Sequence, residues 1–177
     1  MSESEPARSP RVVVVRHGPA EVRDPRRWAD DALRPLTRKG VAQTRRVAAG
    51  LARMVGPVAC LASSPAARAR RTAEILYDAL ERSTRPTFWP ELDIGGLAGP
   101  IFPRLRAAAR PDATVVLVGH EPTLAEFVGL ALTGDGVPIV RLTKGGAACL
   151  EFPRSVRPGA ARLRWLLTRK QLATAAE

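Results

Sequence analysis

Val12-Val13-Val14-Val15-Arg16-His17-Gly18 is a run of four β-branched residues that stops at an arginine, a histidine and a glycine. Such a run, without polar alternation, predicts a strand buried on both faces, as in a mainly parallel sheet. Residues just beyond the carboxyl end of such a strand lie where open α/β folds bind their ligands. There Arg16 can hold an anion, His17 can attack or transfer a proton, and Gly18 lets backbone approach a ligand closely.

The second of the two histidines in the chain has a similar setting. The apolar run over residues 114–118 leads directly into Gly119-His120. Both histidines therefore follow a predicted buried strand, and this shared placement favours a functional role for both.

Strand and helix patterns alternate along the rest of the chain. Thr37 is a predicted N-cap for a helix that ends at Gly56-Pro57, and a buried strand is expected over residues 58–62. Ser63-Ser64-Pro65 predicts a serine N-cap and a proline at the first position of a second helix. Two further helices are predicted, over residues 101–109 and after Pro122. Further strands are predicted over residues 87–89, 147–152 and 162–167, and the last two are expected to pair antiparallel. A tail is expected from Lys170 onward. This alternation predicts an α/β fold, a three-layer α/β/α sandwich with a mainly parallel mixed sheet.

The length of 177 residues suits one domain, which we expect over residues 11–172 between a disordered N-terminal tail (1–10) and a C-terminal tail (173–177). No apolar run has the length of a membrane span, and the first ten residues lack the apolar core of a signal peptide. We therefore expect a cytoplasmic protein without membrane association. No heptad pattern is evident, so a monomer is the default expectation.

The net charge of +11 comes from arginine, because Lys39, Lys144 and Lys170 are the only lysines. A basic surface suits nucleic acid or anionic substrates. The chain lacks zinc-finger spacing and aromatic residues interleaved with basic ones, so nucleic acid is not the expected partner.

If the predicted strand ends lie side by side, the basic residues that follow them converge. His17, Arg16, Arg68 and His120 would then share a pocket, with Arg34 reaching in from a loop. Without a third histidine or a carboxylate cluster these residues suit a metal poorly. They suit a phosphoryl group well, because its oxygens need several fixed donors. An anion there would also explain an arginine in the first turn of a helix, where the dipole opposes a cation.

Several segments match a known pattern in order and spacing: Arg16-His17-Gly18, residues 31–40, residues 63–73, Gly119-His120-Glu121-Pro122 and Trp165-Leu166-Leu167-Thr168. In these segments the chain resembles the histidine phosphatase superfamily, and within it the small SixA-like phosphohistidine phosphatases, whose fold is phosphoglycerate mutase-like.

The resemblance implies that His17 is a nucleophile that forms a phosphohistidine intermediate, with the Gly18 backbone fixing its tautomer. It implies no metal and no cofactor. The residues it implies for binding the phosphate are Arg16, Gly18, Arg34, Arg68 and His120.

The general acid stays open. In one branch of the superfamily an acid directly follows the second histidine, and Glu121 holds that place here. In the mutase-like branch a glutamate stands in a loop that resembles Glu91-Leu-Asp93-Ile-Gly95. SixA-like proteins can lack both, and a phosphorylated histidine needs less acid assistance than an ester because its imidazole leaves as a neutral group.

We therefore expect a metal-independent phosphatase that acts on protein phosphohistidine, such as a histidine phosphotransfer domain. One alternative is a phosphomonoesterase acting on a small phosphoester. The other is a non-catalytic module that binds phosphate or nucleic acid on the same fold.

Overall fold

The computed structural model describes residues 9–80 and 85–176. Apart from Ser9 and Pro10, the predicted N-terminal tail lies outside the described residues. Pro10 is joined to the sheet, since its carbonyl accepts a hydrogen bond of 3.0 Å from the N–H of Phe152. Among the described helices, none combines the length and apolar character that crossing a membrane requires.

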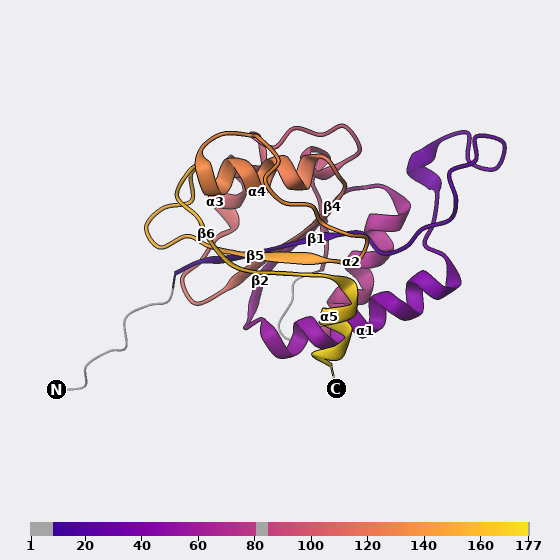
Figure 1. Cartoon of the computed structure of the whole chain (residues 1–177), viewed down its shortest axis with the longest axis horizontal. Helices are drawn as coiled ribbons and strands as arrows, with labels where there is room; N and C mark the ends of the chain where they lie inside the picture. The colour runs from indigo at the N-terminus through magenta and orange to yellow at the C-terminus, as the bar shows by residue number, and fades with distance from the viewer. Residues whose placement is uncertain (1–8, 81–84, 177) are drawn as a thin grey trace.

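A six-stranded sheet forms the centre of the molecule, in the order β3-β2-β4-β1-β5-β6 (Figure 1). The strands are β1 (Arg11–Arg16), β2 (Val58–Ser63), β3 (Thr87–Phe88), β4 (Thr114–Gly119), β5 (Ala147–Glu151) and β6 (Arg162–Leu167). The pairs among β1 to β4 are parallel, whereas β5 and β6 are added antiparallel. The sheet is therefore mixed and mainly parallel, as predicted.

The valine run lies at the middle of this sheet, and Val12 to Val15 are fully buried. Because side chains alternate along a strand, the run contributes to two hydrophobic clusters on opposite faces. One face is covered by α3 (Ile101–Ala108) and α4 (Thr123–Thr133). The other face is covered by α1 (Arg38–Met54), α2 (Ala67–Ala79) and α5 (Arg169–Thr174). Figure 1 shows α3 and α4 on one side of the sheet and α1 and α5 on the other, which confirms the three-layer sandwich.

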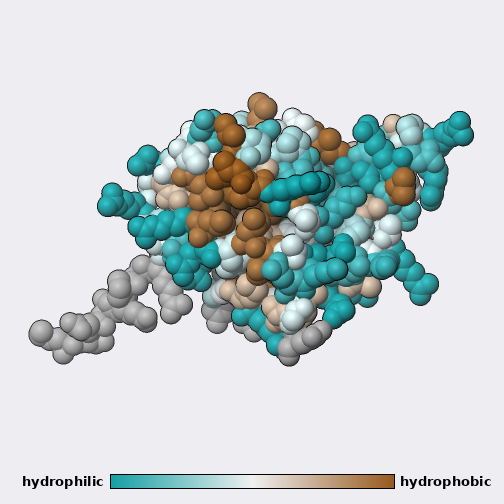
Figure 2. All heavy atoms as spheres, in the orientation of Figure 1, coloured by the Kyte–Doolittle hydropathy of each residue, from teal (hydrophilic) through white to brown (hydrophobic). Residues whose placement is uncertain are grey.

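The segment between β1 and α1 protrudes from the body of the molecule and holds a one-turn 3₁₀ helix, η1 (Asp31–Leu33) (Figure 1). It returns to the body at Thr37, whose Oγ1 accepts a hydrogen bond of 2.8 Å from the N–H of Gly40 and caps α1 as predicted. A second 3₁₀ turn, η2 (Pro90–Leu92), follows β3. Figure 2 shows that the protruding segment is mostly hydrophilic.

The predicted start of α2 was wrong. α2 begins at Ala67, its N-cap is Ala66, and no side chain caps it. Ser64 Oγ accepts a hydrogen bond of 3.1 Å from the N–H of Ala66, and Pro65 precedes the helix rather than opening it. The Ser64 hydroxyl thus binds the backbone just before the first residue of α2, and it also contacts His120 and Asp93 at the end of the sheet.

The predicted tail from Lys170 onward was also wrong, because residues 169–174 form α5. A capping box between Thr168 and Gln171 starts this helix, and Leu172 is fully buried. A single buried residue in a six-residue helix leaves no periodic pattern in the sequence.

Gly50 lets α5 pack closely on α1, since a Cβ at this position would overlap the carbonyl oxygen of Leu172. We predict that Gly50→Ala lowers the free energy of unfolding by about 1–3 kcal/mol through overpacking, although alanine is the better helix former. Urea unfolding followed by circular dichroism measures this. The control is Ala49→Gly at the neighbouring exposed position, which reports helix propensity alone. A Gly50→Ala chain more stable than wild type would contradict the packing.

Candidate active site

The carboxyl ends of three neighbouring strands meet at one edge of the sheet. β2, β4 and β1 are adjacent and parallel, with Ser63 paired to Val118 and Arg16 paired to Gly119. The residues that follow these ends are therefore brought together, although they are far apart in the sequence.

His17 follows β1 directly and is 5% exposed. Its Nδ1 lies 2.7 Å from the carbonyl oxygen of Gly18. Because a carbonyl only accepts, Nδ1 carries the hydrogen, and the lone pair of the neutral ring is on Nε2. That Nε2 accepts a hydrogen bond of 3.3 Å from Nε of Arg68. The Gly18 N–H donates to Oγ1 of Thr72 at 3.0 Å, so the residue whose carbonyl orients His17 is itself held by α2.

The two imidazoles lie close together and are neutral at pH 7. Their ring centroids are 4.9 Å apart. Burial, followed by the charges of His120, Arg68 and Arg16, lowers the pKa of His17 to about 3, while the hydrogen bond to Gly18 acts in the opposite direction. Burial, followed by the charge of Arg68, lowers the pKa of His120 to about 4, while Asp93 acts in the opposite direction.

His120 is oriented by side chains from two other segments. Its Nε2 lies 2.8 Å from Oγ of Ser64, and Ser64 donates its hydroxyl proton to Oδ1 of Asp93 at 2.9 Å. Oγ of Ser64 therefore accepts from His120, which places a hydrogen on Nε2 of His120. Oδ1 of Asp93 is itself 4.0 Å from that nitrogen. The carboxylate of Asp93 thus favours the charged form of His120.

Asp31, in the protruding segment, binds two of the arginines. Nε and Nη2 of Arg34 donate to its two carboxylate oxygens, at 2.8 and 3.3 Å. Nη2 and Nη1 of Arg68 donate to its Oδ2 and its carbonyl, at 3.0 and 2.7 Å. The hydrogen bond from Arg34 is the main reason that the pKa of Asp31 is lowered. Asp31 therefore balances part of the positive charge at the start of α2, which the sequence alone assigned to a bound anion.

Two nitrogens of the Arg16 guanidinium differ in their surroundings. Its Nη1 donates to the carbonyl of Leu142 at 2.8 Å, while its Nε is buried without a hydrogen-bond partner among the described residues. The N–H of Leu142 donates to Glu121 at 2.8 Å, and the other Glu121 oxygen accepts from the N–H of Ala125 at 3.2 Å. Glu121 thus helps to position Leu142, whose carbonyl holds Arg16.

Glu91 is paired with an arginine of α3. Its carboxylate accepts a hydrogen bond of 2.8 Å from Nε of Arg104 on α3. In the described part of the chain, neither Glu91 nor Glu121 forms a hydrogen bond or ion pair with His17 or His120. The carboxylate that reaches His120 is Asp93, a residue of the same loop to which the sequence assigned no role.

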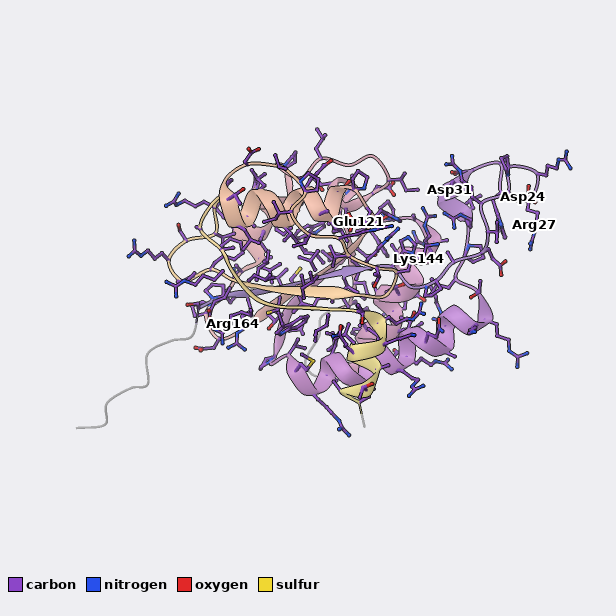
Figure 3. The ribbon with its side chains drawn as sticks, in the orientation of Figure 1. Asp24, Arg27, Asp31, Glu121, Lys144 and Arg164 are labelled. Carbon is purple, nitrogen blue, oxygen red and sulfur yellow. The ribbon has the colours of Figure 1, made fainter. Side chains whose placement is uncertain are left out.

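Lys144 is another residue for which the sequence predicted no role at the site. Burial is the main cause that lowers the pKa of Lys144, and the charges of Arg16, Arg34 and Arg68 lower it as well. Lys144 therefore lies near the arginines of the site. Figure 3 shows Lys144 and Glu121 at the end of the sheet nearer Asp31, with Arg164 at the opposite end. The signal in the sequence was a lysine before Gly145-Gly146, at the entry to a predicted strand.

Residues 12–110 match the model of the histidine phosphatase superfamily (branch 1). This segment spans β1 to α3 and includes His17, Arg34 and Arg68. The chain belongs to this superfamily. It is a SixA-like phosphatase, with the fold expected from the resemblance.

Three similar proteins support this membership of the histidine phosphatase superfamily. An uncharacterized protein of Picosynechococcus sp. is 38% identical over 149 residues, which cover 84% of this chain and 85% of that protein. Phosphohistidine phosphatase SixA of Escherichia coli K12 is 29% identical over 129 residues, covering 72% and 78% of the two chains. A solved structure of the protein histidine phosphatase SixA complexed with tungstate matches with a TM-score of 0.77 and 26% identity, over 92% of this chain and 99% of that one.

We predict that neither histidine of this phosphatase titrates between pH 5.5 and 8. Proton NMR of the tag-free chain measures this directly, because His17 and His120 are its only histidines. In the guanidinium-unfolded control both titrate near pH 6.5. The unfolded chain therefore binds more protons than the folded one between about pH 6.5 and 4, so stability falls as the pH drops through this range. A midpoint near 6.5 in the folded protein would contradict the site.

We also predict that Asp93→Asn weakens the binding of phosphate. The amide still accepts the hydrogen bond from Ser64, but the negative charge that favours protonated His120 is lost. The inhibition constant of inorganic phosphate against p-nitrophenyl phosphate hydrolysis should rise by about tenfold, a change in binding free energy of about 1.4 kcal/mol. Asp78→Asn, an exposed position on α2, is the control with the same charge change. Equal constants for the two variants would exclude a role for Asp93.

Proposed function

We propose that this phosphatase removes the phosphoryl group from phosphohistidine in proteins, with His17 as its nucleophile. The observation that carries the proposal is the orientation of His17, whose Nδ1 is bound to the Gly18 carbonyl while Nε2 faces Arg68. A neutral imidazole with a fixed tautomer can attack phosphorus without first losing a proton. Similarity to phosphohistidine phosphatase SixA supports the choice of substrate.

In the first step Nε2 of His17 attacks phosphorus in line, and the bond from phosphorus to the nitrogen of the substrate imidazole breaks. The attacking and leaving groups are both imidazoles, so the bond that forms and the bond that breaks are of the same type. The substrate ring leaves as a neutral group when its other nitrogen carries a proton. This exchange needs less help from a general acid than the departure of an alkoxide.

In the second step water attacks phosphorus and the bond to Nε2 of His17 breaks. The hydrogen on Nδ1 remains bonded to the Gly18 carbonyl, so the phosphorylated ring is positively charged and His17 leaves as a neutral imidazole. Orthophosphate carries away the oxygen and the protons of the water. The Gly18 carbonyl is therefore proposed to serve both steps by keeping one proton on Nδ1.

Positive charge for the phosphoryl oxygens is proposed to come from the arginines. Arg16 has an unpaired buried Nε, Arg68 already points Nε at Nε2 of His17, and Arg34 is tied to Arg68 through Asp31. Fixed guanidinium donors stabilise charge on the three equatorial oxygens of a phosphoryl transition state. This donor set supplies the charge without a metal ion.

Neither predicted acid is assigned as the proton donor in this proposal. Both oxygens of Glu121 accept backbone N–H groups, and Glu91 is paired with Arg104. Asp93 is instead a positioning residue, acting on His120 directly and through Ser64. His120 is proposed to bind the phosphoryl group and to become protonated when the anion arrives.

The test is turnover of a phosphorylated histidine phosphotransfer domain and of a panel of small phosphate esters. We expect faster hydrolysis of the phosphoprotein, and trapping of phosphate on His17 after an alkaline quench. His17→Ala should lower turnover by at least about a thousandfold, with an unchanged circular dichroism spectrum and unfolding midpoint.

Other outcomes contradict parts of the proposal. Preference for a small ester would make the protein a phosphomonoesterase. Phosphate binding without turnover of any substrate would make it a binding module. Full activity in His17→Ala would remove the proposed nucleophile.

A further inference from the structure

A cavity of about 540 Å³ lies beside the phosphoryl site, and every charged side chain that lines it is cationic. These side chains are Arg16, Arg141, Lys144, Arg169 and Lys170. The volume is in the range of ligand-binding sites and is far larger than one carboxylate or phosphate group requires.

Four of the five cations of this cavity have no acidic partner within the described part of the chain. Arg141, Lys144, Arg169 and Lys170 form no ion pair there, whereas elsewhere Arg71 pairs with Glu74 and Arg104 with Glu91. Glu121 favours the charge of Arg16, whereas Arg141 and Lys144 both lie close enough to Arg16 for their charges to repel it. Like charges held together in this way favour an anion that relieves the repulsion.

Two close contacts fix the walls of the cavity. The N–H of Gly145 donates to the carbonyls of Arg16 and His17, at 3.1 and 3.0 Å, which holds Lys144 beside the end of β1. The side chain of Arg169 lies across Gly145 and has room there because glycine lacks a Cβ. The buried Leu172 anchors α5, which carries Arg169 and Lys170.

Arg16 connects this cavity to the phosphoryl site. Its Nη1 is bonded to the carbonyl of Leu142, and its buried Nε has no partner among the described residues. Arg16 is the last residue of β1 and directly precedes His17. An anion in the cavity would therefore lie next to the group that is dephosphorylated, and we expect the two anions to belong to the same substrate.

We infer that the cavity receives acidic side chains of the phosphorylated protein, next to its phosphohistidine; this rests on the proposed function. Arg141, Lys144 and Lys170 are exposed, so a macromolecule has access to them. The cations come from two segments, 141–144 and 169–170, which allows more than one carboxylate to bind. Complementary charge of this kind selects partners and speeds their encounter.

The test compares two synthetic peptides that carry one phosphohistidine, flanked in one by aspartates and in the other by asparagines. We expect the wild-type chain to have about a tenfold higher kcat/KM for the aspartate peptide at low salt, and a smaller preference in about 300 mM sodium chloride. The double variant Arg141→Glu/Lys170→Glu should lose the preference. Arg53→Glu/Arg106→Glu, with the same change of net charge at exposed positions on α1 and α3, should keep it.

Equal rates on the two peptides, or a preference that survives in Arg141→Glu/Lys170→Glu, would overturn the inference. If neither peptide is hydrolysed, the proposed function fails. The cavity is then tested by fluorescence anisotropy, which measures binding of the labelled, unphosphorylated aspartate peptide. Binding lost only in Arg141→Glu/Lys170→Glu supports the inference, and equal binding by both double variants overturns it. Tighter binding of a single-stranded oligonucleotide than of the peptide also overturns it.

Discussion

The hydrogen bond between Nδ1 of His17 and the carbonyl of Gly18 determines what the rest of the site can do. It assigns the proton of a neutral ring to one nitrogen and leaves the lone pair on the other, which faces Arg68. The bond depends on the rigid setting of β1, whose four valines are fully buried between helices on both faces. It also depends on Thr72 of α2, which accepts the N–H of Gly18. The packing of the sheet and of α2 therefore reaches the proposed chemistry through a single residue, Gly18.

Charge at the site is divided between residues that bind each other and residues kept free. Asp31 neutralises part of the charge of Arg34 and Arg68 and fixes their positions. Arg16 and Lys144 form no ion pair in the described part of the chain, and burial, followed by the positive charges around Lys144, lowers the pKa of Lys144. The pairs with Asp31 fix the positions of Arg34 and Arg68, whereas Arg16 and Lys144 attract anions. The phosphoryl site and the neighbouring cavity therefore attract a substrate with more than one negative group.

The sequence predicted the fold and the convergence of His17, Arg16, Arg68 and His120, because a valine run and strand-end positions depend on local patterns. It did not predict α5, whose one buried residue, Leu172, gives no periodicity. The sequence predicted a serine cap for α2, whereas the hydroxyl of Ser64 contacts His120 and Asp93. These tertiary contacts cannot be read from the local sequence. Asp93 and Lys144 approach the site from loops, and no spacing in the chain encodes where a loop folds back. Glu121 and Glu91 matched a family pattern, yet their partners in the fold are backbone amides and Arg104.

The most direct measurement is to identify which nitrogen of His17 carries phosphate in the trapped phosphoenzyme. Phosphorus NMR of the alkali-denatured intermediate distinguishes the two isomers of phosphohistidine. The account predicts phosphate on Nε2, because Nδ1 is occupied by its bond to the Gly18 carbonyl. Phosphate on Nδ1 would require that bond to break before attack, and it would contradict the role assigned to Gly18.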